Sequence, residues 1–330
     1  MRKNRILCLS LLSTILVAGL SNMTTAADDI SLRLNWKMKG EFTPFVVAVQ
    51  KGFFKAEGLN VKVNEGRGAT QALQTVASGQ DDIAYVPSIQ TIKAINKGMP
   101  VKVVATVVKL DPMGMVSKSN IPLSKPKDLE GRIVEISPVS TLHQIWDAFA
   151  KKNNINVSKV KVVRAAPSAR FGLLLNNKVD ILGDVFLTNE YPVLQSKVKG
   201  KMNTLRVADW GFQLLGYTLV ANNKLISGNP SAIRKFNAAA IRGFKFTLDH
   251  PDEAASIAAK AHPNALKLKT TKMQVAQLVD FIKRGKPAQM FIGDDAGWKR
   301  TLVVLKSSGV ISKQKSLSDY YTNAFVPGIK

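Results

Sequence analysis

The sequence has very little cysteine: Cys8 is the only one in 330 residues, and it lies close to the N-terminus. The segment around it begins with basic residues, continues with an apolar stretch from Ile6 to Leu20, and ends in the small residues Ala26 and Ala27. This layout is typical of a secretory signal peptide, and we place the cleavage after Ala27. A mature chain without cysteine excludes disulfides, thiolate metal sites and cysteine nucleophiles.

Histidine and catalytic motifs are also scarce. The three histidines, His143, His250 and His262, show no spacing with carboxylates that is typical of a metal site. Neither a Gly-x-Ser-x-Gly nor a Gly-Lys-Thr sequence occurs. After Leu20 no apolar stretch approaches the roughly 20 residues that a membrane-spanning helix needs. We therefore predict an exported protein that is not an enzyme and that uses no cofactor or metal.

Acidic residues are few relative to basic ones. The 47 Lys and Arg residues against 23 Asp and Glu give a formal net charge of +24. Such an excess suits nucleic acid, an anionic membrane surface or an anionic ligand. The lysines are scattered, however, and no basic stretch is interleaved with aromatic residues. We interpret them mainly as solvated side chains, predict no nucleic-acid partner, and expect the positive field to help draw an anionic solute inward.

Strand and helix patterns alternate along the mature chain. Residues 31–36 and 60–64 alternate polar and apolar side chains as strands do, whereas Phe45, Val46 and Val49 recur at helical spacing between them. The same order continues through the middle of the chain, and the last third is helical. This alternation predicts an α/β fold with mostly parallel sheets and helices on both faces.

A strand pattern at residues 217–221 returns the chain to its first part before the C-terminal helices. The middle third is therefore expected to form an inserted second lobe, joined to the first by two crossing segments near residues 109–115 and 209–217. Two lobes joined in this way can hinge around a ligand cleft. The predicted boundaries are residues 1–27 for the signal peptide, 28–112 and 215–330 for lobe I, and 113–214 for lobe II.

Several segments occur in an order and spacing typical of one family. They are Trp36, the run Phe42-Thr43-Pro44-Phe45, and residues 48–61, 66–69, 76–84, 125–132 and 179–183. With these segments the chain resembles the periplasmic binding proteins for nitrate, sulfonates, taurine and thiamine pyrimidine precursors. The resemblance implies a type II periplasmic-binding-protein fold of two doubly wound lobes, a periplasmic location, and an ABC permease with its ATPase as partner.

The resemblance also suggests the ligand. Trp36, the Gly-Arg-Gly loop at residues 66–68 and the segment 188–192 look most like the pyrimidine-precursor branch, in which a carboxylate near Glu190 and stacking aromatics hold the ring. The segment Asp184-Val185-Phe186 departs from that branch, and Arg67 equally suits an anionic solute such as a sulfonate, taurine, nitrate or an aromatic carboxylate. The same fold also suits a periplasmic ligand sensor for a membrane receptor or, as an enzyme, a pyrimidine synthase. We expect a monomer that binds a small-molecule solute.

Three loops follow predicted strands and open helices, where ligands bind in doubly wound folds. At Gly68 and Ala69 backbone amides can approach a ligand, and Arg67 can offer paired donors, although the same residues also suit a tight turn. Ser88 either contacts a ligand or caps its helix. Ser140 and Thr141 occupy the equivalent place in lobe II, ahead of a helix that carries His143.

Side chains at strand ends supply the remaining candidates. Trp36 is placed to stack on a flat ligand, or else is a core residue, and Phe186 and Trp210 are candidates for the facing wall. Asp184 and Glu190 can accept hydrogen bonds from an amine or cap helices. Trp146 and Trp298 are assigned to packing. The full set of candidate ligand-binding residues is Trp36, Phe42, Arg67, Gly68, Ala69, Ser88, Ser140, Thr141, His143, Asp184, Phe186, Glu190 and Trp210.

Overall fold

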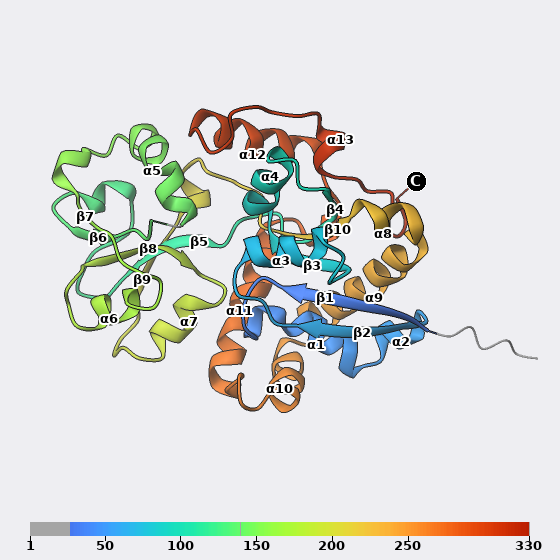
Figure 1. Cartoon of the computed structure of the whole chain (residues 1–330). Helices are drawn as coiled ribbons and strands as arrows, with labels where there is room; N and C mark the ends of the chain where they lie inside the picture. Colours follow the sequence, from blue (N-terminus) through green and yellow to red (C-terminus); the bar gives the residue numbers. More distant parts are fainter. Residues whose placement is uncertain (1–26, 139, 330) are drawn as a thin grey trace, which may run out of the picture.

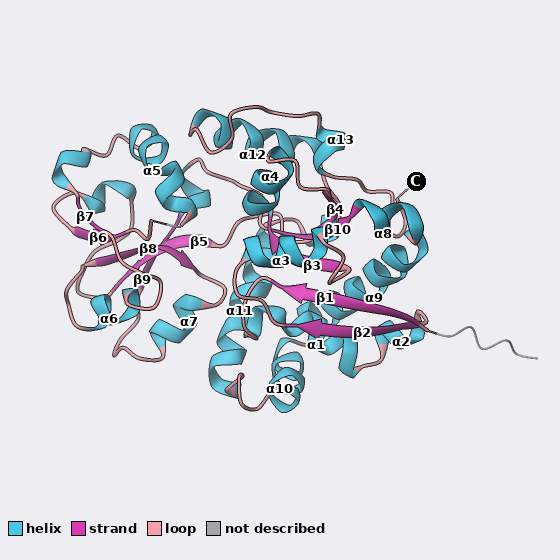
Figure 2. Cartoon of the chain, viewed as in Figure 1, coloured by secondary structure: helices cyan, strands magenta, loops and turns pink. Residues whose placement is uncertain are grey.

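The computed structural model describes residues 27–138 and 140–329. Apart from Ala27, the predicted signal peptide lies outside the described residues. The chain forms two mixed five-stranded sheets, each flanked by helices (Figures 1 and 2). Within the described ranges, no helix combines the length and the apolar character needed to cross a bilayer.

The first sheet is built mainly from the N-terminal part of the chain and has the strand order β2-β1-β3-β10-β4. β1 pairs in parallel with β2 and β3, whereas β10 is antiparallel to β3 and β4. The predicted return strand is thus the antiparallel member of this sheet. Its strands are β1 (Asp28–Leu34), β2 (Leu59–Asn64), β3 (Ile83–Pro87), β4 (Val101–Thr106) and β10 (Tyr217–Asn222).

The second sheet repeats this plan with the order β7-β6-β8-β5-β9. β6 is parallel to β7 and β8, and β5 is antiparallel to β8 and β9. β5 begins at Met113, within the segment 109–115 that is predicted to cross between the lobes, and it was not predicted as a strand. Every residue of β5 is buried, so the segment lacks the alternation that marks a half-exposed strand. The strands are β5 (Met113–Ser117), β6 (Ile133–Glu135), β7 (Lys161–Val163), β8 (Ile181–Phe186) and β9 (Asn203–Arg206).

Helices cover both faces of the first sheet. On one face α1 packs against α9 and α10, with Phe45, Tyr85 and Phe244 in edge-to-face contact in the core. On the other face α3 and α4 pack against β3 and β10. The helices of this part are η1 (Gly40–Phe42), α1 (Thr43–Gln50), α2 (Phe53–Ala56), α3 (Ala69–Ala77), α4 (Ser88–Asn96), α8 (Asn223–Gly228), α9 (Pro230–Asp249), α10 (Pro251–Ala261), α11 (Leu268–Arg284), η5 (Pro287–Gln289), α12 (Asp295–Ser307) and α13 (Leu317–Tyr320).

Shorter helices surround the second sheet. They are η2 (Pro126–Leu129), α5 (Thr141–Lys152), η3 (Val157–Lys159), α6 (Arg170–Leu175), α7 (Glu190–Gln195) and η4 (Val207–Trp210). The sequence from Pro126 to Glu130 also predicts a helix, and there the structure has only the 3-10 turn η2. The sequence predicts a helix from Thr141 to Lys152, and α5 has these bounds; the Ser140 hydroxyl accepts a hydrogen bond from the His143 backbone N–H and caps its start.

The two parts of the molecule share a continuous apolar cluster. α12, near the C-terminus, packs against α5 of the second sheet, and Leu302, Phe149 and Phe212 belong to the same buried cluster. Figure 1 shows α12 above and α11 below the region between the sheets. Trp146 and Trp298 are buried in this cluster, as predicted from their positions in helices. The lobe boundaries stay a prediction.

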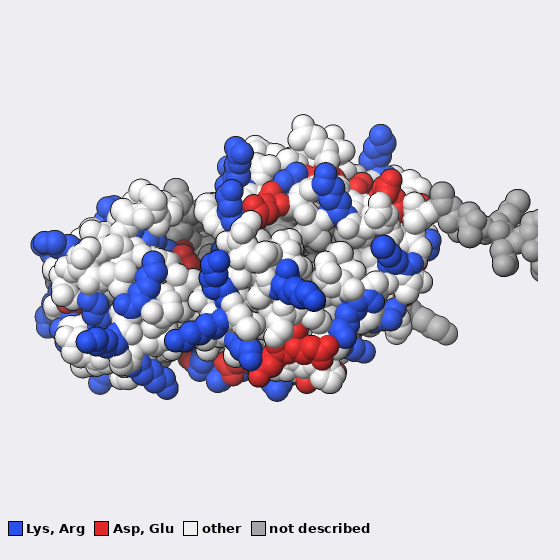
Figure 3. All heavy atoms as spheres, turned by 90° about the horizontal axis from the view of Figure 1, so that it is seen from below, with Lys and Arg blue, Asp and Glu red and all other residues white. Residues whose placement is uncertain are grey.

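Basic side chains are spread over the surface. On the face shown in Figure 3, Lys and Arg lie over both parts of the molecule, and Asp and Glu lie among them in several smaller groups. On this face the positive charge is not gathered in one patch. This distribution agrees with the interpretation of the lysines as solvated side chains.

Candidate ligand-binding cavity

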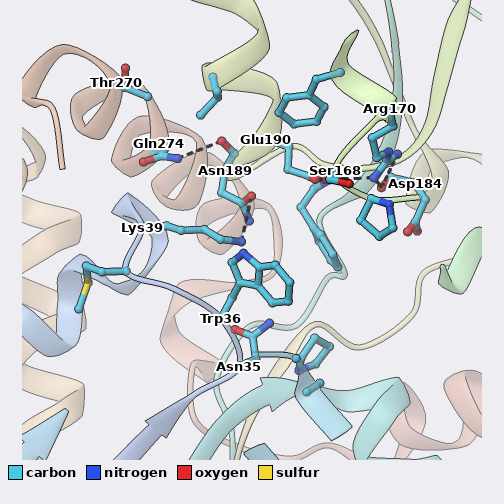
Figure 4. A pocket seen from close by; sticks show the side chains of 18 of the residues that line it. Asn35, Trp36, Lys39, Ser168, Arg170, Asp184, Asn189, Glu190, Thr270 and Gln274 are labelled. Carbon is cyan, nitrogen blue, oxygen red and sulfur yellow. Dashed lines mark hydrogen bonds and ion pairs between the residues drawn. The ribbon is translucent and has the colours of Figure 1, made fainter. Parts of the chain in front are cut away.

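A cavity of about 960 Å³ lies between the two sheets. Its lining comes from both parts of the chain: from the end of β1, the start of α3 and α4, the loops before α5 and α6, the end of β8, α7, and the start of α11. Figure 4 shows the side chains that surround it. Eight of the predicted site residues line this cavity: Trp36, Gly68, Ala69, Ser140, Thr141, Asp184, Phe186 and Glu190.

Trp36 is positioned by the glycine loop. The indole is 43% exposed, which is unusual for so large an apolar side chain. The Gly66 backbone N–H donates to the Trp36 carbonyl at 3.1 Å, and that of Gly68 donates to the Asn35 carbonyl at 2.8 Å. A Cβ at Gly66 would lie 2.1 Å from the Leu34 carbonyl oxygen, so only glycine fits there. The loop therefore fixes the end of β1. Arg67 is exposed and lies outside the cavity lining, so the prediction that it contacts the ligand is corrected.

Asp184 lies on the facing wall in an unusual backbone conformation. Its φ of 52° is in the left-handed region, at an irregularity where the pairing of β8 with β5 shifts register. Bulges of this kind re-aim a side chain and are common next to functional sites. The carboxylate accepts a hydrogen bond from the Leu142 backbone N–H at 3.3 Å, at the start of α5. Burial raises the pKa of Asp184 to about 6, and nearby Arg170 opposes that effect.

Arg170 is the central cation of this wall, and it is not among the residues predicted from the sequence. Its Nε donates to Glu135 at 3.1 Å, and its Nη1 lies 3.6 Å from Glu190. The other guanidinium hydrogens point at the carbonyl oxygens of Gly183 and Asp184. All three guanidinium nitrogens thus engage protein acceptors. Arg170 is the first residue of a helix that follows β7 and a loop. The same position, a helix start after a strand and a loop, is what identified Ser140.

Glu190 and Phe186 are held together. The Glu190 carboxylate accepts a hydrogen bond from the Phe186 backbone N–H at 2.9 Å, which orients both side chains at the end of β8. Phe186 lies 6.4 Å from Tyr217 between ring centroids, and both line the cavity. Burial, and next the charge of Glu41, raise the pKa of Tyr217 well above its ordinary value. Tyr217 therefore stays a neutral phenol on the aromatic wall.

Five predicted residues lie outside the lining. Phe42 is fully buried and packs edge-on against Tyr85. Ser88 is buried, does not cap α4, and donates through its hydroxyl to the Leu215 carbonyl at 2.5 Å. Trp210 packs against the apolar cluster that contains α12. His143 does not line the cavity, and Arg67 is exposed.

Several lining residues gave no signal in the sequence. Thr270, Thr271 and Gln274 come from α11, more than two hundred residues after Trp36 in the chain. Gln274 joins the two parts, since its Nε2 donates to the Asn189 carbonyl at 3.0 Å and its Oε1 accepts from the Gly40 N–H at 2.9 Å. Lys39 points across the cavity, with its Nζ 3.4 Å from the Asn189 side-chain oxygen (Figure 4). Tertiary packing brings the α11 residues to the cavity, whereas Lys39 lies in the loop after β1 that also holds Trp36.

A buried carboxylate forms a second link between the two parts. Glu41, in η1, is 2% exposed and accepts hydrogen bonds from Thr188 Oγ1 at 3.0 Å and Asn189 Nδ2 at 2.8 Å. Its other oxygen lies 3.4 Å from the Tyr217 hydroxyl and 3.8 Å from Lys39 Nζ. Because Thr188 and Asn189 follow β8 of the second sheet, these contacts close one side of the cavity.

The described residues contain no group of three or more His, Cys, Asp and Glu side chains that could hold a metal ion. The cavity instead combines aromatic faces with amide, hydroxyl and paired charged groups. Two such α/β parts around a cavity define the two-lobed fold of periplasmic binding proteins. The aliphatic sulfonate-binding protein SsuA of Escherichia coli has this fold, with a TM-score of 0.70 over 90% of this chain and 99% of that one at 13% identity.

The chain belongs to the NMT1/THI5-like family, whose model matches residues 39–254. It is 27% identical to the riboflavin-binding protein RibY of Chloroflexus aurantiacus, over 99% of both chains. It is 24% identical to a formylaminopyrimidine-binding protein of Halalkalibacterium halodurans, over 76% of this chain and 77% of that protein. A 4-amino-5-hydroxymethyl-2-methylpyrimidine phosphate synthase of Legionella pneumophila is also 24% identical, over 92% and 94% of the two chains. The predicted family is therefore confirmed.

Proposed function

We propose that this chain is an exported solute-binding protein that holds a flat heteroaromatic solute of flavin size and delivers it to an ABC permease. The observation that carries the proposal is the cavity of about 960 Å³ with aromatic side chains on both walls. This volume lies at the upper end of the roughly 300–1,000 Å³ typical of small-molecule sites. A three-ring isoalloxazine with its ribityl chain uses such a volume better than a single pyrimidine ring does.

The lining also matches a ligand with both a flat and a hydroxylated part. Trp36, Phe186 and Tyr217 offer aromatic faces, and the Trp36 indole is exposed enough for a ring to stack on it. Thr270 and Ser168 offer hydroxyl groups that can both donate and accept hydrogen bonds, as a polyol chain requires. The riboflavin-binding relative, which matches over nearly its whole length, supports the same ligand class.

A pyrimidine precursor of thiamine is the second candidate. The Glu190 carboxylate, held by the Phe186 N–H, lies in the same cavity as Trp36 and suits an aminopyrimidine. The formylaminopyrimidine-binding relative supports this candidate. Anionic solutes such as sulfonates, taurine, nitrate or aromatic carboxylates are less well supported, because Arg67 lies outside the lining and Arg170 is engaged by protein acceptors.

We infer binding rather than catalysis. The synthase relatives keep an enzyme as the competing hypothesis, but the only cysteine of this chain lies in the segment that we interpret as a signal peptide. The test is recovery of the ligand: riboflavin incubated with the purified protein should be released unchanged on denaturation. Release of 4-amino-5-hydroxymethyl-2-methylpyrimidine phosphate that had not been added would favour the enzyme.

The binding test is a titration of riboflavin with the purified mature chain, followed by flavin fluorescence. Stacking on Trp36 should quench the emission, and Trp36→Ala should weaken binding roughly tenfold or more, since an aromatic stacking contact is worth about 1–3 kcal/mol. Arg67→Ala, an exposed neighbour outside the lining, is the control and should bind like the wild type. Absence of quenching, together with a higher melting temperature in the presence of 4-amino-5-hydroxymethyl-2-methylpyrimidine, would favour the pyrimidine ligand instead.

A further inference from the structure

Lys39 brings a positive charge to the inner part of the cavity. Four basic side chains line the cavity: Lys39, Arg170, Lys197 and Lys267. Lys197 and Lys267 are exposed, and all three guanidinium nitrogens of Arg170 engage protein acceptors. The Lys39 side chain is 22% exposed and lines the cavity, so it is sheltered from bulk solvent but open to a molecule bound there.

The Lys39 ammonium has donors that the protein does not use. An ammonium carries three N–H donors. Among the described residues, its hydrogen bond goes to the Asn189 Oδ1 atom at 3.4 Å, which is long for such a bond. Glu41 Oε1 lies 3.8 Å from the Lys39 Nζ atom, beyond hydrogen-bond distance. At least one N–H is therefore left for a ligand.

The ammonium also lies beside the residue on which the ligand is proposed to stack. The Lys39 Nζ atom is 5.9 Å from the centroid of the Trp36 ring, and Figure 4 shows the side chain extending between Trp36 and Asn189. Aromatic rings that stack with an offset have centroids about 4.5–7 Å apart. A ring stacked on the indole in this way lies about as far from it as the ammonium does. The ammonium then meets the edge of that ring, where carbonyl oxygens and ring nitrogens lie.

The backbone on both sides of Lys39 is fixed. The Met38 backbone N–H donates to Glu65 Oε1 at 2.8 Å, and the Gly40 N–H donates to Gln274 Oε1 at 2.9 Å. A side chain that starts from a fixed backbone loses less freedom when it binds a ligand, so more of the contact energy appears as affinity. The Lys39 donor is thus positioned before the ligand arrives.

The charges around the ammonium favour an uncharged acceptor over an anion. Glu41 is 2% exposed and already offsets the positive charge from 3.8 Å away. Asp184 and Glu190 line the same cavity and would repel a further negative charge. A carbonyl oxygen or a ring nitrogen avoids this repulsion and still gains a hydrogen bond from a charged donor.

We infer that Lys39 determines specificity by donating a hydrogen bond to a carbonyl oxygen or ring nitrogen on the edge of the heteroaromatic ligand that stacks on Trp36. This inference rests on the proposed function, because it names the part of that ligand that Lys39 binds. In a flavin these acceptors belong to the pyrimidine half of the isoalloxazine. At mildly alkaline pH, two-electron reduction places a negative charge on this half, so Lys39 should hold the reduced flavin more strongly than the oxidised one.

The protein test measures the Kd of oxidised riboflavin and, without oxygen, of dithionite-reduced riboflavin. Lys39→Met keeps the reach of the side chain but removes the ammonium. It should weaken binding of the oxidised flavin roughly tenfold and of the reduced flavin by roughly a further tenfold. The two-electron potential of the bound flavin should then lie about 30 mV lower than in the wild type. Lys39→Arg keeps the charge and the donors and should retain most of the difference.

A matched control lies two residues away. The Lys37 side chain is 72% exposed beside Glu65 and is outside the cavity lining. Lys37→Met removes one positive charge from the same loop, as Lys39→Met does. It should bind both forms of riboflavin like the wild type, because solvent screens an exposed charge.

A purely structural role of Lys39 would give a different result. Lys39→Met leaves Glu41 without its counter-ion, and this would loosen the contacts of Glu41 with Thr188 and Asn189. Looser contacts weaken binding of both forms of riboflavin equally, so the ratio of the two Kd values would stay as in the wild type. Comparing Lys39→Met/Glu41→Gln with Glu41→Gln repeats the measurement without a buried unpaired charge.

Lumiflavin shows which part of the ligand Lys39 contacts, since it keeps the flavin ring and has a methyl group in place of the ribityl chain. Lys39→Met should change the Kd ratio for lumiflavin as it does for riboflavin. A change seen with riboflavin alone would mean that Lys39 binds the ribityl hydroxyls, which overturns the inference and leaves the proposed function standing. An unchanged ratio for both flavins has the same consequence. If riboflavin does not bind to the wild type, both are wrong.

Discussion

A single buried carboxyl links the protonation state of the protein to its stability. Asp111 lies between β4 and β5, is 4% exposed, and accepts a hydrogen bond from the Met113 backbone N–H at 2.9 Å. Burial and, to a smaller extent, the charges of Asp184 and Glu41 raise the pKa of Asp111 from 3.8 to about 7, against the effect of the Met113 hydrogen bond. The folded state therefore holds this proton more tightly than the unfolded state does.

This difference in proton binding determines how the free energy of unfolding changes with pH. Between the ordinary carboxyl pKa and about 7, the folded protein binds more protons than the unfolded chain, so the free energy of unfolding falls as the pH rises through this window. Asp184 contributes in the same direction up to about pH 6. We expect Asp111→Asn, which keeps an acceptor for Met113, to lose most of the fall that the wild type shows between about pH 6 and about pH 8.

Urea unfolding at these two pH values measures the effect. Asp252→Asn is the control, because that carboxylate is 80% exposed beside Lys272. An Asp111→Asn variant with the same fall as the wild type would show that Asp111 does not titrate in this window.

At the scale of elements, the turn from Gly66 to Gly68 supports β1. A Cβ at position 66 would meet the Leu34 carbonyl oxygen at 2.1 Å and the Asn35 carbonyl carbon at 3.0 Å, both of which are backbone atoms that cannot swing away. We expect Gly66→Ala to destabilise the fold by about 1–3 kcal/mol and to weaken ligand binding, because it displaces Trp36.

Gly172→Ala is the matched control for this substitution. Gly172 lies inside α6, has open space around its Cα, and should gain about 0.5–1 kcal/mol from the better helix former. Thermal unfolding and the riboflavin titration test both variants. A Gly66→Ala variant as stable as the wild type would refute the support that we assign to this turn.

Elements with a clear period could be predicted from the sequence, and those without one could not. The bounds of α5 follow from its cap at Ser140 and its apolar spacing. The inner strand β5 is buried on both faces and short, so neither alternation nor length marked it. Because β5 was not recognised as a strand, the sequence did not reveal that the second sheet contains antiparallel as well as parallel pairs.

The residues of the cavity can also be divided into those that could be predicted from the sequence and those that could not. Residues at or soon after a strand end, such as Trp36, Ser140 and Phe186, could be placed because the strand order fixes that edge of the sheet. Gln274 could not, because the packing of α11 against α7 brings it there. Ser88 shows the limit of the rule: it follows a strand end, yet its hydroxyl holds the Leu215 carbonyl in the core.

At the scale of the whole molecule, the contacts around Glu41 join the two parts beside the cavity. Glu41 accepts from Thr188 and Asn189 across the boundary, and Gln274 donates to the Asn189 carbonyl. Each of these bonds exists only when the two parts lie close together. We propose that the two parts open and close around the cavity, so that these bonds add to the stability of the closed arrangement alone.

Thr188→Val should shift the equilibrium between the closed and open arrangements without removing a contact to the ligand. Thr188 is 2% exposed and does not line the cavity, and valine keeps its shape while removing the hydroxyl that donates to Glu41. A hydrogen bond to a charged group contributes roughly 1.5–3 kcal/mol, so the closed population should fall and the apparent Kd should rise by about tenfold or more. Small-angle scattering of the ligand-free protein should show a larger radius of gyration.

Thr247→Val separates this effect from a general loss of stability. Thr247 is equally buried, but its hydroxyl donates to the Gly243 carbonyl within α9, so its loss cannot favour the open form. We expect Thr247→Val to leave both the radius of gyration and the apparent Kd unchanged. Equal effects of the two substitutions would mean that they act through stability alone, because an interaction made only in the closed form must change its population relative to the open form.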